Sequence, residues 1–329
     1  MSENNCKVSI LCTAFNHEEY IAEALESFVS QKTDFSFEVI VNDDCSSDNT
    51  ADIIREYAEK YPDIIRPLYQ KENLFSRGLD YLYETAFYSR MRGEYIAFCE
   101  GDDKWLDENK LQLQVNFLDS HRDYSACVHN TVLHYCGSDR ADELLAGDAE
   151  EDRDVDFETV LSGMSEAFHT SSVMARREFI LNPPDYYCAA ADHGFLDYPI
   201  ALRLSLAGKI RFIARPMSMY RISSNSAAWS ARLDRHYGKL KEFIVGELAM
   251  MEKLLPHLDS VQKEAAEKEI LRRRYELLYI EGRVDEMVKP PYREIYKTMP
   301  LSYRVKTTIK RLCPALHRAY RKKQGYGDY

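Results

Sequence analysis

The stretch "EYIAFCEGDDKW", residues 94–105, joins a short apolar run to a tight cluster of acids. The apolar run has the length of one buried strand, and Glu100, Asp102 and Asp103 then crowd around Gly101. Carboxylates this close repel one another and are costly to remove from water. The stretch therefore predicts a polar site at the end of a buried strand.

Two earlier stretches show the same pattern, an apolar run followed by polar residues. "VSILCTAFN" (8–16) and "FEVIVNDDCSSD" (37–48) are apolar runs that end in polar residues, and each is followed by a helical pattern. A weaker strand is expected at 64–69. This alternation predicts an α/β fold with a mostly parallel sheet and helices on both faces. Since ligands bind beyond the carboxyl ends of such strands, we expect the three polar clusters to share one site.

The pattern changes near residue 230. Residues 1–230 carry the strand and helix alternation, whereas residues 231–329 show long helical patterns whose apolar positions suit packing. We predict an α/β domain over 1–230 and a helical C-terminal region with a basic tail over 231–329.

Composition narrows the class of protein. The chain has 329 residues, 45% of them hydrophobic, and a formal net charge of −11, which indicates a globular protein and argues against a nucleic-acid partner. The sequence opens without the basic and apolar regions of a signal peptide, so we expect a cytoplasmic location. Eight cysteines without a CxxC pair predict reduced thiols, not disulfides or a zinc site.

The acids after residue 99 favour a metal site. Hard divalent cations such as Mn²⁺ and Mg²⁺ prefer oxygen ligands, and three acids in four residues exceed what a helix cap requires. The "NDDCSSD" stretch is explained at least as well by a turn and a helix cap. The sequence has neither a glycine-rich phosphate loop nor a G-x-S-x-G elbow.

One further acid opens a predicted helix. In "FLDYPIALRLSLAGKI", Asp197 stands at the helix start and Pro199 lies in its first turn. A cap explains this aspartate fully, and a general base is the alternative. Asp192 is a rival for that role.

Five motifs in this order resemble the inverting family 2 glycosyltransferases with the GT-A fold. The resemblance covers residues 7–230 and is carried by "VSILCTAFNHEEYIAEALESFVSQ", "FEVIVNDDCSSDNT", "YIAFCEGDDKW", "LDYPIALRLSLAGKI" and "MYRISSNSAAWS". It implies a metal-dependent enzyme that moves a sugar from a nucleoside-diphosphate sugar, with UDP expected. The acceptor would be a hydroxyl of a glycan or a lipid-linked molecule, in surface polysaccharide biosynthesis.

The resemblance also implies roles for single residues. It assigns donor contacts to Thr13, Phe15, Asp44, Arg77, Glu100, Asp102 and Asp103, the metal ligands to Asp102 and Asp103, and the catalytic base to Asp197. The metal would be Mn²⁺ or Mg²⁺. One position departs from the family, because Ser223 stands after "YR" where many relatives carry a histidine that helps hold the metal and the diphosphate. Acceptor contacts are expected from residues 169–177, for which a buried strand is an equal explanation.

Two other functions fit parts of the pattern. A sugar-nucleotide or glycan-binding GT-A domain without turnover is one, and another metal-dependent nucleotidyl or phosphoryl transferase is the second. The tail is a separate question, since no acid occurs from Ile295 to Gly327. We weigh an anionic membrane surface bound through residues 301–323 equally against a packed helix or a homodimer contact.

Overall fold

The computed structural model describes residues 6–163, 168–187, 196–223 and 237–312. The chain divides into two compact units, residues 1–232 and 233–329.

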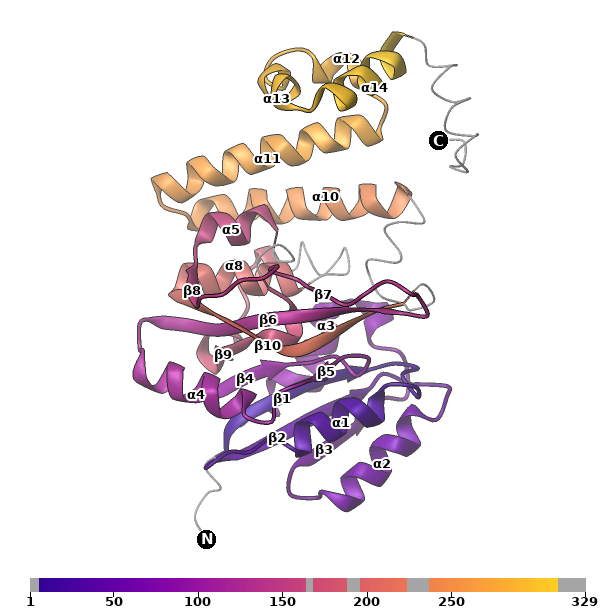
Figure 1. Cartoon of the computed structure of the whole chain (residues 1–329), viewed down its shortest axis with the longest axis vertical. Coiled ribbons are helices and arrows are strands. Elements are labelled where there is room, and N and C mark those ends of the chain that lie inside the picture. Colours follow the sequence, from indigo (N-terminus) through magenta and orange to yellow (C-terminus); the bar gives the residue numbers. More distant parts are fainter. Residues whose placement is uncertain (1–5, 164–167, 188–195, 224–236, 313–329) are drawn as a thin grey trace. The chain divides into compact units, whose positions relative to one another are not determined.

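A ten-stranded sheet forms the centre of the first unit, in the order β3-β2-β1-β4-β9-β6-β10-β5, with β7 and β8 paired beside β6 and β10 (Figure 1). Its strands are β1 (Cys6–Ala14), β2 (Ser36–Asp43), β3 (Ile65–Tyr69), β4 (Tyr95–Phe98), β5 (Lys104–Trp105), β6 (Tyr124–Cys136), β7 (Glu143–Leu144), β8 (Arg153–Val155), β9 (Met174–Arg176) and β10 (Lys209–Ser223).

Strands β3, β2, β1 and β4 are all parallel, whereas β9 runs antiparallel between β4 and β6. The predicted α/β fold is thus confirmed, and the four strands read from the sequence form its parallel half. Beyond β9, strands β6 and β10 pair parallel to each other. The sequence pattern allowed a buried strand in the region of β9 as one of two explanations, and it did not predict β6 or β10.

Both faces of the parallel half are buried. The helices of this unit are α1 (Ile21–Val29), α2 (Thr50–Lys60), α3 (Leu79–Tyr83), α4 (Lys110–Ser120), α5 (Phe157–Ser162) and α8 (Asp197–Ala207). Residues Val8, Ile10 and Cys12 of β1 pack with apolar residues of α1, α2 and α4 in one core. Leu11 points the other way and is buried too, as expected for a strand between two covered faces.

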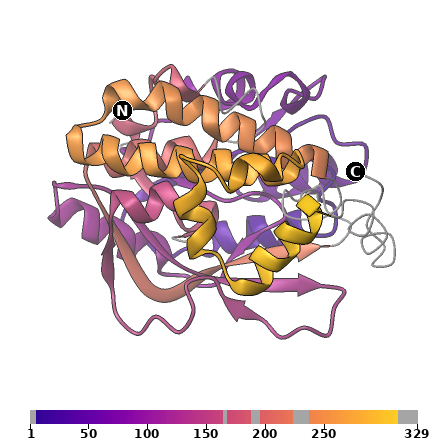
Figure 2. The same ribbon diagram turned by 90° about the horizontal axis from the view of Figure 1, so that it is seen from above.

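The second unit is helical. It comprises α10 (Tyr237–Leu254), α11 (Ser260–Ile280), α12 (Val284–Met287), α13 (Arg293–Thr298) and α14 (Leu301–Leu312). Helices α10 and α11 run side by side (Figures 1 and 2). Asp259 and Gln262 form a capping box that fixes the start of α11. Within the described ranges, no helix is both long and apolar enough to cross a membrane.

Candidate functional site

The carboxyl ends of β1, β2 and β4 meet at one edge of the sheet. Their register pairs Ala14 of β1 with Asp43 of β2. On the other side of β1, the Gly101 backbone N–H donates to the Thr13 carbonyl at 2.8 Å, so the acidic turn continues beside β1. The three polar clusters expected to share a site therefore lie on adjacent strands.

The loops after β1 and β2 are fastened to each other. The backbone N–H of Asn16 donates to Ser46 Oγ, and the N–H of Ser47 donates to Asn16 Oδ1. Asn16 and Cys45 both have positive φ, at 55° and 67°, a conformation that is uncommon in non-glycine residues although less so for asparagine. Thr13 lies half-buried beneath these loops, and Phe15 exposes 39% of its surface.

Asp44 is almost fully buried, and its carboxylate accepts two backbone hydrogen bonds from the turn that begins at Leu74. Its Oδ1 accepts the backbone N–H of Leu74 at 2.7 Å, and its Oδ2 accepts that of Phe75 at 2.9 Å. Sequence reasoning did not foresee these bonds, which join residues 30 positions apart. The assignment of Asp44 to the nucleotide base stays a prediction.

Arg77 lies on the short turn that Asp44 holds. Its Nη1 donates to Glu72 at 2.8 Å, and its guanidinium lies over the ring of Tyr81, 3.8 Å from the centroid. About half of the Arg77 side chain remains exposed, so it can turn towards an anion. Donor contact by Arg77 also stays a prediction.

The acidic turn after β4 carries charges with few partners. Glu100 Oε2 is buried and makes no hydrogen bond. Burial, Asp102 and Asp197 together raise the pKa of Glu100 to about 7. Burial and the charges of Asp102 and Glu100 raise the pKa of Asp103 well above its ordinary value. The protein alone therefore favours protons on this turn.

Arg221, the arginine of the "YR" motif, fixes the shape of this turn. Its backbone N–H donates to Asp103 Oδ1 at 3.1 Å, and its Nη1 donates to the Asp102 carbonyl at 2.9 Å. Its Nη2 bonds Glu23 Oε2 at 2.7 Å. The motif was visible in the sequence, but its partner lies 119 positions away.

Two histidines to which the sequence pattern gave no metal role flank the turn, and one of them, His169, begins the segment expected to contact the acceptor. His17 Nε2 lies 3.8 Å from Asp102 Oδ2, and His169 Nδ1 lies 3.7 Å from Asp103 Oδ2. Burial lowers the pKa of His169 to about 4, so this ring is neutral at pH 7 and stacks on Tyr220. The same Nδ1 of His169 also bonds Ser171 Oγ at 2.8 Å, so the ring is held in place beside the acidic turn.

Residues 171–176 of the segment expected to contact the acceptor are buried. Arg176 is buried, and its guanidinium donates to the carbonyls of Tyr124 and Leu118. Strand β9 therefore matches the buried-strand explanation over Met174–Arg176. Only the His169 end of the segment reaches the acidic turn.

Asp197 begins α8. Leu196 occupies the N-cap position without a side-chain cap, and Asp197 Oδ1 accepts only the adjacent Tyr198 N–H among the described hydrogen bonds of its side chain. Partial desolvation by surrounding protein raises the pKa of Asp197, although the residue reaches solvent. Asp192 and the side chain of Ser223 lie outside the described residues.

The hydroxyl of Tyr83 lies within electrostatic range of both Glu100 and Asp197. Burial, and then the charges of Glu100 and Asp197, raise the pKa of its hydroxyl well above the ordinary value. Glu100 and Asp197 are thus close enough to influence the same phenol and each other. Asp197 therefore lies within electrostatic range of Glu100, one of the three acids of the turn.

The acidic turn suits a divalent cation whose coordination shell is completed by oxygens of a bound substrate. Among the described residues, no three His, Cys, Asp or Glu side chains already surround an ion position. Glu100 Oε2 nevertheless has no partner, and the pKa values of Glu100 and Asp103 are raised. A bound cation would pair with the free oxygen and offset the repulsion between the carboxylates. Magnesium-type sites commonly combine one or two carboxylates with substrate phosphates.

Comparison with known proteins identifies close sequence relatives. The family model for glycosyl transferase family 2 matches residues 9–227. An uncharacterized protein of Mycobacterium tuberculosis is 35% identical over 228 residues, which are 69% of this chain and 62% of that protein. The chain thus spans less than two thirds of that relative. TuaG of Bacillus subtilis, named for teichuronic acid biosynthesis, is 35% identical over 111 residues, 34% of this chain and 41% of its own.

A solved structure has the same fold. Staphylococcus aureus TarS in complex with UDP-GlcNAc aligns with a TM-score of 0.63 at 18% identity, covering 98% of this chain and 93% of that chain. This likeness shows the fold alone.

Proposed function

The chain belongs to glycosyl transferase family 2, and on that premise we propose that it transfers a sugar from a UDP-sugar to a hydroxyl of a glycan or lipid-linked acceptor. The observation that carries the proposal is the acidic turn of Glu100, Asp102 and Asp103, with Asp197 in its electrostatic neighbourhood. The complex of TarS with UDP-GlcNAc supports a nucleotide-sugar donor. The match to TuaG supports a role in surface polysaccharide biosynthesis.

Donor binding is proposed for the edge of the sheet within residues 1–230. Asp102 and Asp103 would hold Mn²⁺ or Mg²⁺, with Glu100 beside them, and the cation would supply Lewis-acid stabilisation of the departing diphosphate. Thr13, Phe15, Asp44 and Arg77 would contact the nucleotide. Arg221 positions the turn through its bonds to Asp102 and Asp103. Residues 231–329 would form a separate helical region.

Acceptor activation is proposed for Asp197. Its carboxylate takes the proton of the acceptor hydroxyl while that oxygen forms a bond to the anomeric carbon. The bond from this carbon to the diphosphate oxygen breaks, and the nucleoside diphosphate leaves with the electron pair. A single displacement from the opposite face inverts the anomeric centre. The raised pKa of Asp197 fits a base that must accept a proton.

Replacing the base tests the proposal. Asp197→Asn should lower sugar transfer by roughly a hundredfold or more, the usual scale of general base catalysis. Transfer is measured as released UDP and as labelled sugar in the product, after a screen of UDP-sugars for stabilisation of the protein. The affinity for the donor should change little, because the base faces the acceptor.

The matched control is Asp63→Asn, the same change at an exposed aspartate before β3, at the opposite edge of the sheet. It should transfer at the wild-type rate. Near-normal transfer by Asp197→Asn would show that Asp197 is not the catalytic base. If the wild type binds the donor but forms no sugar-containing product, a binding domain without turnover would be favoured.

A further inference from the structure

Helix α14 exposes a continuous apolar stripe. Leu301, Val305, Ile309 and Leu312 have exposed fractions of 69%, 49%, 38% and 68%. At about 100° per residue they fall within an arc of about 80° on the helix. Scattered exposed apolar residues need no explanation, but four aligned on one helix face do.

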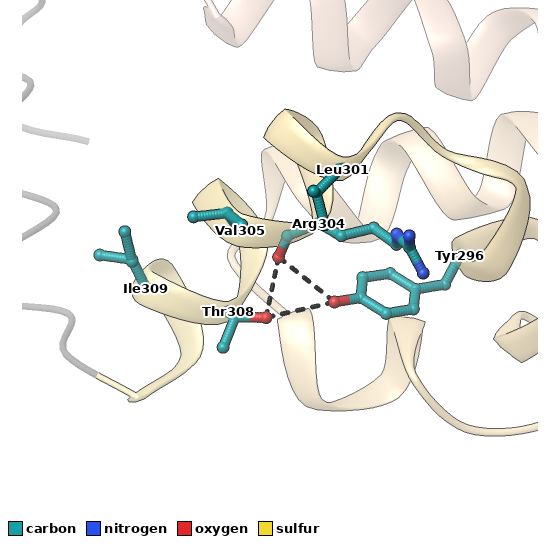
Figure 3. A pocket seen from close by; sticks show the side chains of 6 residues that line it. All are labelled: Tyr296, Leu301, Arg304, Val305, Thr308 and Ile309. Carbon is teal, nitrogen blue, oxygen red and sulfur yellow. Dashed lines mark hydrogen bonds between the residues drawn. The ribbon is translucent and has the colours of Figure 1, made fainter.

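The buried face of α14 lies opposite this stripe. Thr307 is fully buried, and the ring of Tyr303 packs against Tyr279, 5.3 Å between centroids. Figure 3 shows Val305 and Ile309 on the side of α14 away from Tyr296, whose hydroxyl donates to the Arg304 carbonyl. The inner face therefore already holds the helix to its unit, and the stripe is free for another contact.

Basic residues border the stripe on both sides. Arg304 and Lys306 lie about 100° to either side of its centre, and Arg311 follows on the Arg304 side. Arg311 bonds Asp285, and Lys306 is exposed. A hollow of about 300 Å³ adjoins the stripe and is lined by Tyr296, Leu301, Arg304, Val305, Thr308 and Ile309 (Figure 3).

We propose that α14 binds an anionic lipid surface, with the stripe at the headgroup boundary and the flanking basic residues on lipid phosphates. An apolar arc bordered by Lys and Arg is the pattern of helices that lie in a membrane interface. A second copy of the chain fits less well, because an isologous contact through this face would bring the same basic residues together. The sequence extends the charge, with eight Lys and Arg in residues 303–323 and no acid from 295 to 327.

The test measures flotation of the full chain with lipid vesicles, without donor, so that failure would leave the transfer proposal intact. Binding should require phosphatidylglycerol, at about a third of the lipid in phosphatidylcholine, and should weaken as salt rises. Val305→Glu/Ile309→Glu should lower the partition coefficient at least about tenfold, because it places charge in the stripe. Lys306→Gln should lower it roughly fivefold.

Val261→Glu is the matched control, since Val261 is 70% exposed as a single apolar residue on α11. It should bind like the wild type, and circular dichroism checks that each variant folds. The proposal is overturned if the wild type fails to float with anionic vesicles, if neutral vesicles bind it equally, or if Lys306→Gln and the double variant bind like the wild type. A dimer in light scattering that Val305→Glu/Ile309→Glu splits, without flotation of the wild type, would assign the stripe to a second copy.

Discussion

The turns at residues 42–45 and 100–103 hold adjacent acids at the ends of the two strands that flank β1. The carboxylates of the two turns differ in their hydrogen-bond partners. In the 42–45 turn, both oxygens of Asp44 accept backbone N–H groups from Leu74 and Phe75. In the 100–103 turn, Glu100 Oε2 has no partner, and the pKa values of Glu100 and Asp103 are raised.

The difference separates an acid that builds the fold from acids available to a ligand. The Asp44 carboxylate holds a loop in place by accepting two backbone N–H groups. Crowded carboxylates with few donors gain most from a cation. Asp43 shows that the 42–45 turn is not wholly satisfied, because burial raises its pKa and its Oδ1 has no partner. Its neighbour Asp44 nevertheless uses both of its oxygens to accept backbone N–H groups, whereas Asp103 accepts one and Glu100 Oε2 accepts none.

The largest effect is expected from Asp102→Asn. This change removes a proposed ligand from the 100–103 turn and should lower metal-dependent transfer at least about a hundredfold, since a cation contributes several kcal/mol to the transition state. Thermal unfolding of the metal-free protein should be unchanged or slightly higher, because one crowded charge is gone. Transfer and unfolding are measured on the same preparations.

Asp63→Asn again serves as the control for a lost carboxylate. Calorimetry of UDP binding with Mn²⁺ and with EDTA gives an independent reading. Equal UDP affinity under both conditions, in wild type and Asp102→Asn alike, would contradict the metal assignment and erase the distinction between the two turns.

Asp44→Asn should act on stability first. The amide retains one acceptor and points an NH₂ group at the second backbone N–H, which should lower the free energy of unfolding by about 2 kcal/mol. Hydrogen exchange should accelerate at Leu74 and Phe75, and Arg77 on the same turn would be less well placed. Unchanged unfolding with lost UDP affinity would instead make Asp44 a base contact alone.

The sequence predicted the parallel half of the sheet and the meeting of its polar ends, because both follow from local periodicity and from the rule for parallel strands. It could not predict how each charge is used. Asp44 depends on N–H groups 30 positions away, and the Asp103 bond to Arg221 spans 118. His17 and His169 are likewise brought to the acids only by the folded chain.

The smallest effect is expected in the pH dependence of the metal-free protein. Folding raises the pKa of Glu100 from 4.5 to about 7. Between these values the folded chain holds a proton that the unfolded chain has released, so the Glu100 contribution to the free energy of unfolding falls as pH rises from about 4.5 to 7. Asp103 and Asp197 have raised pKa values and act in the same direction.

Glu100→Gln isolates the contribution of this residue, because glutamine does not titrate. Denaturant unfolding at pH 5 and pH 8 with EDTA should show a decline in the wild type that is about 1–2 kcal/mol smaller in the variant, after allowance for the partly exposed side chain. Mn²⁺ should reduce the wild-type decline, since a cation favours the charged carboxylates. Equal declines in the two proteins would show that Glu100 does not contribute to the pH dependence of the free energy of unfolding. The two acidic turns would then differ only in hydrogen bonding.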